Sequence, residues 1–139
     1  MPGFNELAGL YGKYRVLRWK MEATATNLEL DYPLNFIVFP SNFDLGNNYS
    51  QVQSQFGNSF AQYKYISPKG GMDRATIKTP WLTARQIVGS DSVYVDDDYA
   101  SNTNTSPTNN SYMNVAIWTG NAVNLAQGVG LQVDITAEI

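Results

Sequence analysis

Two groups of charged residues are the first places in this 139-residue sequence where chemistry could occur. The acidic group is Asp96, Asp97 and Asp98, whose carboxylate oxygens could bind Ca²⁺. The group lacks the spaced Asp, Gly and terminal Glu of an EF-hand loop. A solvated acidic loop is therefore the simpler interpretation, and no other metal site is predicted.

The second group is the only dense cluster of positive charge in the chain. On a predicted strand Arg18 and Lys20 share one face, where they could contact the phosphates of a nucleic acid. A charged edge strand or a solvated face is the alternative interpretation, and both stay open. The candidate nucleic-acid contacts are Lys13, Arg15, Arg18 and Lys20.

Few residues of the chain could support catalysis. The sequence contains no Cys and no His, which excludes thiolate nucleophiles, disulfides and a Ser-His-Asp triad. Carboxylate pairs can hydrolyse glycosides, but Asp73, Asp91 and Asp134 have no motif around them. We therefore predict that the protein is not an enzyme and uses no cofactor.

The overall composition is that of a globular domain with a weakly charged surface. Hydrophobic residues make up 43% of the chain, which is enough for a core, and only 15% of residues are charged. The net charge of −3 argues against a chain-wide attraction for nucleic acid. No apolar run is long enough to span a membrane and no signal peptide is visible, so no membrane partner is predicted.

Apolar and polar residues alternate in most of the segments between loops, and this pattern predicts an all-β protein. Tyr63 to Lys78 is predicted to form a β-hairpin around a turn at Pro68–Gly71, with its tyrosines in the core. One or two short helices are expected, at 4–11 and within 41–59. The other predicted strands are 13–26, 34–39 ending at Pro40, 113–119 and 131–139. The start of strand 13–26 is expected to have either a bulge near Val16–Leu17 or burial on both faces.

Long loops between these strands favour a two-sheet sandwich with Greek-key crossings over an up-and-down barrel. The length indicates a single domain, residues 1–139. Segment 80–89 fits either a helical turn or a short strand, and 90–111 is a long loop. Four aromatic residues could form a sugar-binding platform, although aromatics on alternating strands are more often core: Trp19, Trp81, Trp118 and Tyr63.

The order of several short motifs resembles the jelly-roll capsid proteins of circoviruses and related small circular single-stranded DNA viruses. An acidic loop with Tyr99 and a final alternating strand from Val129 to Ile139 also fit this family. The motifs are Tyr11-Gly12-Lys13-Tyr14-Arg15-Val16, Gln62-Tyr63-Lys64-Tyr65, Gly70-Gly71, Ala75-Thr76-Ile77-Lys78, Gln86-Ile87-Val88-Gly89 and Pro107-Thr108.

The resemblance implies a structural role and a jelly-roll β-sandwich. Many copies would form a small icosahedral or other homo-oligomeric shell around single-stranded DNA, with large loops such as 41–59 and 90–111 at subunit contacts. The resemblance places the protein in the virion and leaves the host nucleus open as the place of assembly. It implies no catalysis.

Two features depart from the family pattern. The Arg-rich N-terminal arm is missing, and only about ten residues precede Lys13, so the first full strand is missing too. A shortened chain or a partial coat protein is expected, with an incomplete jelly roll that borrows a strand or packs edge to edge in an oligomer. A lectin-like jelly-roll module that binds host glycans, with Ca²⁺ on the acidic loop, is the alternative function.

Overall fold

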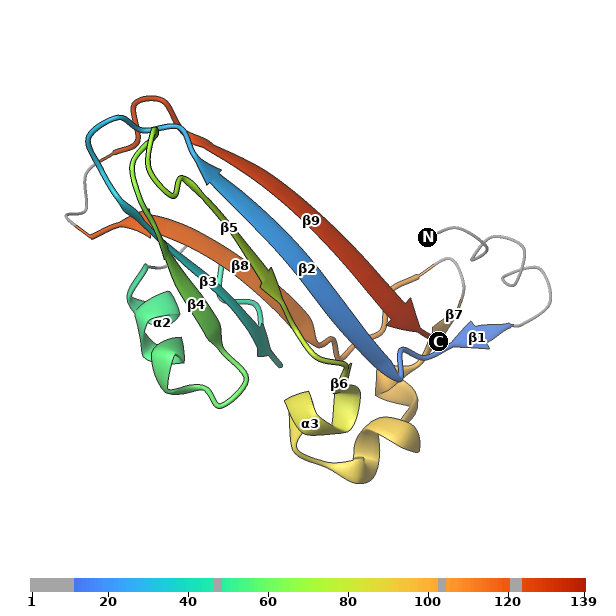
Figure 1. Cartoon of the computed structure of the whole chain (residues 1–139). Helices are drawn as coiled ribbons and strands as arrows, with labels where there is room; N and C mark the ends of the chain where they lie inside the picture. The colour runs from blue at the N-terminus through green and yellow to red at the C-terminus, as the bar shows by residue number, and fades with distance from the viewer. Residues whose placement is uncertain (1–11, 47–48, 103–104, 121–123) are drawn as a thin grey trace.

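The computed structural model describes residues 12–46, 49–102, 105–120 and 124–139, and most of its regular structure is β (Figure 1). This confirms the predicted all-β class with few short helices. The helical turns predicted at 4–11 lie outside the described residues. The strands form three sheets, of which two are large and one is a pair of two-residue strands.

The first large sheet is built around β2 (Arg18–Asn27). β9 (Val129–Glu138) pairs antiparallel with one side of β2 along its whole length. β5 (Arg74–Lys78) and the short β6 (Leu82–Thr83) pair with the other side. The spatial order is therefore β9, β2, then β5 and β6.

The second large sheet is built around β3 (Leu34–Ser41), with β4 (Gln62–Ile66) on one side and β8 (Tyr112–Thr119) on the other. β3 is buried on both faces, as its continuous apolar run predicts. The prediction that Pro40 ends this strand is wrong, because the ladder continues through Pro40 to Ser41. Extended backbone accommodates the fixed φ of proline near a strand end.

The two large sheets pack face to face around one main core. Met21, Ala23 and Ala25 of β2 face Leu34, Phe36 and Val38 of β3, and Ile66 and Ile77 complete the buried cluster. β4 and β5 contact each other on one side of the sandwich, so that side is closed. β8 and β9 are the outermost strands on the opposite side (Figure 1).

The predicted hairpin is wrong in one important respect. Its two arms are β4 and β5, but β4 pairs with β3 and β5 pairs with β2, so the turn crosses from one sheet to the other. The turn itself forms as expected, with Gly70 at a φ of 98° and the amide of Gly71 donating to the carbonyl of Pro68. Each arm pairs instead with a longer, buried strand.

The tyrosines of this segment are not in the core. Tyr63 and Tyr65 lie on the outer face of β4 and are 68% and 64% exposed, because Ile66 is the β4 residue that faces inward. The ring of Tyr63 packs edge-on against Phe56 at 5.6 Å. Phe56 belongs to a short helical segment, α2 (Tyr49–Ser54) and η1 (Gln55–Gly57), which confirms the helix predicted within 41–59.

The predicted strand 13–26 is broken. β1 (Lys13–Tyr14) pairs with β7 (Ser101–Asn102), and residues 15–17 separate it from β2. The guanidinium of Arg15 donates to the carbonyls of Val93 and Asp96, which turns the chain away from the sheet.

The segments between β6 and β7 are the helices α3 (Ala84–Val88), η2 (Asp91–Tyr94) and η3 (Asp97–Tyr99).

A buried polar network joins three loops at the other end of the sandwich. The side chain of Asn27 donates to the carbonyls of Tyr32 and Ser67, and its oxygen accepts from the amide of Glu29. The carboxylate of Glu29 accepts from the amides of Gln127 and Gly128 at 2.6 and 2.8 Å. These bonds fix the connection that leads into β9.

Candidate functional site

The side of the sandwich formed by β8 and β9 is open. Among the residues that the structure describes, β9 pairs only with β2 and β8 only with β3, so each strand has a free edge. Leu131, Val133 and Ile135 of β9 face the same way as the buried residues of β2 but are 49%, 38% and 51% exposed. The hydrophobic core therefore continues onto this side without a cover from the described residues.

The free edge of β8 borders a groove of about 550 Å³. All of residues 113–118 line it, together with Phe39, Leu45 and Val52. Successive residues of a strand point to opposite faces, so a hollow that touches six in a row runs along the edge of the strand. Such an edge offers backbone donors and acceptors to an added strand.

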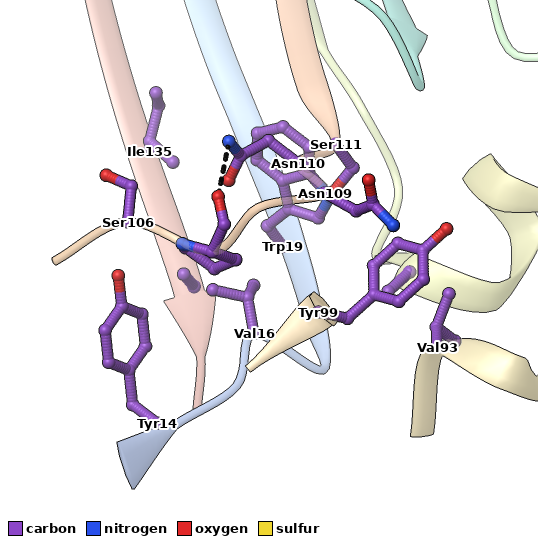
Figure 2. A pocket seen from close by; sticks show the side chains of 13 residues that line it. Tyr14, Val16, Trp19, Val93, Tyr99, Ser106, Asn109, Asn110, Ser111 and Ile135 are labelled. Carbon is purple, nitrogen blue, oxygen red and sulfur yellow. Dashed lines mark hydrogen bonds between the residues drawn. The ribbon is translucent and has the colours of Figure 1, made fainter. Parts of the chain in front are cut away.

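A separate pocket of about 280 Å³ lies at the end of the sandwich near the termini of β1 and β9 (Figure 2). Its apolar part includes Trp19 of β2 and Ile135 of β9. Figure 2 shows Tyr14 and Tyr99 on opposite sides, with the 106–111 loop between them. The polar residues of that loop in the pocket are Ser106, Asn109, Asn110 and Ser111.

Hydrogen bonds hold the walls of this pocket in place. The hydroxyl of Tyr14 donates to the carbonyl of Thr105 at 3.0 Å, and the amide of Asn109 donates to the carbonyl of Asp98 at 2.9 Å. The indole N–H of Trp19 is buried and has no hydrogen-bond partner within the described part of the chain. An unpartnered buried donor costs free energy, so a bound acceptor at this position would stabilise the site.

Comparison with known proteins identifies no relative. No family model, no curated protein and no solved structure matches this chain. The function must therefore be inferred from the chain's own residues and geometry.

The acidic group does not converge on a common point. The carboxylate of Asp96 accepts from the amide of Asp98, and Asp97 forms an ion pair with Lys13 at 3.6 Å. Within the described ranges no three carboxylates lie close enough to hold a metal ion. Calcium binding by Asp96, Asp97 and Asp98 stays a prediction without support from this geometry.

The four candidate nucleic-acid contacts are divided between two places. Lys13 and Arg15 hold the η2–η3 segment through Asp97 and two backbone carbonyls. Arg18 and Lys20 both lie against the ring of Trp81 on the outer face of β2, with their charged groups 4.9 and 5.1 Å from its centre. Only this second pair presents adjacent positive charge on a sheet face.

Positive and negative side chains nearly balance each other on this outer face of β2. Arg18 also forms an ion pair with Glu138, and Lys78 forms one with Glu22 at 3.0 Å. Exposed pairs of this kind are weak and are screened by salt. A phosphate group could compete for Arg18 and Lys20, so the nucleic-acid contact stays a prediction.

The other candidate residues are dispersed. Asp91 pairs with Arg85 at 2.9 Å, whereas Asp73 lies next to β5 and Asp134 lies on β9. The four aromatics proposed for a sugar platform are also separate: Trp19 lines the pocket, Trp81 lies under Arg18 and Lys20, and Trp118 and Tyr63 flank Phe56.

Sequence reasoning expected an unpaired sheet edge but did not identify β8 and β9 as the strands that carry it, and it missed the full pocket. The alternating pattern of β9 identified a strand but not the absence of a neighbour. The only signal for the pocket was the Asn/Ser-rich tract after residue 101, which was identified as a long loop and contributes residues from 106–111 to the pocket wall.

No helix in the described part of the chain has the length and hydrophobicity needed to cross a membrane.

Proposed function

We propose that the chain is a structural subunit that assembles with further copies of itself through the open side of its sandwich. One observation carries this proposal: two free strand edges lie on the same side, next to exposed apolar residues of the inward face of β9. An uncovered edge with an apolar flank is a site for intermolecular strand pairing. Self-assembly is the function that uses this feature directly.

The same observation supports an incomplete jelly roll. A jelly roll has eight strands in two sheets. Here β9, β2 and β5 form one main sheet and β8, β3 and β4 form the other, and each sheet has a free edge for one more strand. This arrangement agrees with the resemblance to the coat proteins of small circular single-stranded DNA viruses, in which the subunits would enclose DNA within the virion.

Sedimentation velocity and negative-stain imaging of the purified chain test this proposal. We expect rings, shells or smaller oligomers at micromolar concentration, and we expect added single-stranded DNA to promote them at low salt. The double variant Arg18→Gln/Lys20→Gln should reduce the DNA effect, because these residues are the adjacent positive charges on a sheet face. A well-folded monomer at every concentration, with and without DNA, would contradict the proposal.

Glycan binding is a second candidate function, and the pocket in Figure 2 favours it. Aromatic rings, amide side chains and an unpartnered indole N–H surround a volume of about 280 Å³. Ligand sites for drug-sized molecules are usually roughly 300–1,000 Å³. This smaller volume suits a single sugar ring, with apolar faces against the rings and hydroxyls toward the amides.

The Tyr99→Ala variant tests this second candidate on a glycan array. Removing this wall of the pocket should weaken binding by about fivefold, since aromatic contacts of this kind contribute on the order of 1 kcal/mol. Tyr94→Ala is the matched control, because Tyr94 is 43% exposed and does not line the pocket. An array without signal for the unmodified chain would leave assembly as the single candidate function.

A further inference from the structure

We infer that two copies of the chain pair antiparallel through β9, on a two-fold axis at Val133. This inference rests on the proposed self-assembly and names the surface that carries it. The sheets of the two copies, each built from β9, β2, β5 and β6, would join into one continuous sheet across the axis. β9 is long, its inward face carries no charge, and its sequence complements itself.

β9 is an edge strand with little of the usual protection, since its two charged residues, Asp134 and Glu138, both lie on the outward face. It is ten residues long and contains no Lys, Arg or Pro, the residues that natural edge strands use to prevent pairing. No charged residue points inward from it, since Leu131, Val133 and Ile135 are the inward positions at its centre. The β4 and β5 edges lie on the closed side of the sandwich, where these strands contact each other.

The inward face of β9 complements its own copy in one register. With Val133 opposite its mate, Leu131 lies opposite Ile135 and Val129 opposite Ala137. Cross-strand pairs of aliphatic residues stabilise antiparallel sheets. The side chains of Leu131, Val133 and Ile135 are 38–51% exposed in the single chain, so pairing would bury apolar surface that the described residues leave open.

The outward face selects the same register. Around Val133, Gln132 lies opposite Asp134 and Gly130 opposite Thr136, so no two like charges lie directly opposite each other. Moving the axis to Asp134 would place two Asp134 carboxylates directly opposite each other, which is unfavourable. Moving it to Gln132 would shorten the overlap from residues 129–137 to residues 129–135. The Val133 register therefore has the longest overlap without charge repulsion.

Single-cysteine variants test the register, because the chain contains no Cys of its own. Val133→Cys is expected to form a disulfide-linked dimer under mild oxidation, since opposed residues in an antiparallel pair have Cβ atoms about 4.5–5.5 Å apart. Leu131→Cys alone is the control, because it would lie four residues from its mate. A mixture of Leu131→Cys and Ile135→Cys proteins is expected to cross-link to each other.

A charge variant tests the contribution of β9 to assembly. Val133→Lys would place two ammonium groups together on the axis and is expected to weaken association by at least ~100-fold. Gln132→Lys is the matched control: its side chain points outward and would lie opposite Asp134 of the second copy, so association is expected to stay equal or strengthen. Circular dichroism of both variants checks that the fold is retained.

The outcomes separate the two proposals. Oligomers that form without a Val133→Cys cross-link and survive Val133→Lys would overturn β9 pairing and leave self-assembly in place. A monomer whose cysteine at position 133 reacts freely with thiol reagents would overturn both proposals. A monomer in which that cysteine is protected would also overturn both, and would show that a different segment covers β9.

Discussion

Replacing Phe36 with alanine should lower the free energy of unfolding by about 3–5 kcal/mol, the usual cost of removing a buried aromatic side chain. Phe36 lies in the middle of β3 and is 0% exposed. It belongs to the core cluster that joins the two large sheets, so the cavity would open between them. In a domain of this size the melting temperature should fall by roughly 10 °C or more.

Phe43→Ala is the matched control for this prediction. Phe43 lies two residues after the end of β3 but is 50% exposed, so its removal should cost less than about 1 kcal/mol. Urea denaturation of both variants, followed by tryptophan fluorescence, measures the difference. Equal losses of stability would mean that the sheets do not pack around Phe36.

Removing the carboxylate of Glu29 should lower the free energy of unfolding by about 3 kcal/mol, because each hydrogen bond to a charged group contributes about 1.5–3 kcal/mol. Glu29 is 3% exposed and accepts from two backbone amides. In Glu29→Ala both amides would remain near the protein interior without an acceptor. Glu29→Gln keeps one side-chain oxygen and should lose less.

Glu22→Ala is the control for Glu29→Ala. Glu22 forms an exposed ion pair with Lys78, a type that contributes at most about 1 kcal/mol. Hydrogen exchange adds a local measurement: the amides of Gln127 and Gly128 should lose protection in Glu29→Ala and keep it in Glu22→Ala. Unchanged protection of these amides in Glu29→Ala would contradict the role assigned to Glu29.

The sequence predicted individual strands better than it predicted their neighbours. The alternation of apolar and polar residues is a property of a single chain segment. It revealed β8 and β9 because a strand whose two faces have different surroundings alternates in this way. Which strands pair depends on contacts between distant segments. The sequence therefore predicted that β4 and β5 pair with each other as a hairpin, although β4 pairs with the longer β3 and β5 pairs with the longer β2.

The tyrosines of β4 show a second limit of the pattern. Tyr63 and Tyr65 share a face, as predicted, but the alternation does not say which face is covered. The register with β3 places Ile66 opposite Leu34 in the core, so the tyrosines point outward. Outside the core Phe56 provides an aromatic contact for Tyr63.

The candidate sites were harder to predict because they depend on tertiary arrangement. The basic cluster was visible from spacing, but the break at residues 15–17 separates Lys13 and Arg15 from Arg18 and Lys20. The pocket combines residues from β1, β2, β9 and the 106–111 loop, and no local motif connects them. An unpaired edge was expected from the incomplete jelly roll, but no residue type encodes that β8 and β9 are the strands without a second neighbour.

The pairing of β2 with β9 has a consequence for how the chain is made. Arg18 lies opposite Glu138, which is 120 residues further along the chain, so β2 waits for a partner that is synthesised much later. Folds dominated by such distant pairings usually fold in milliseconds to seconds. During synthesis one edge of β2 stays available to other nascent chains, so the yield of native protein should depend on how crowded its polysomes are.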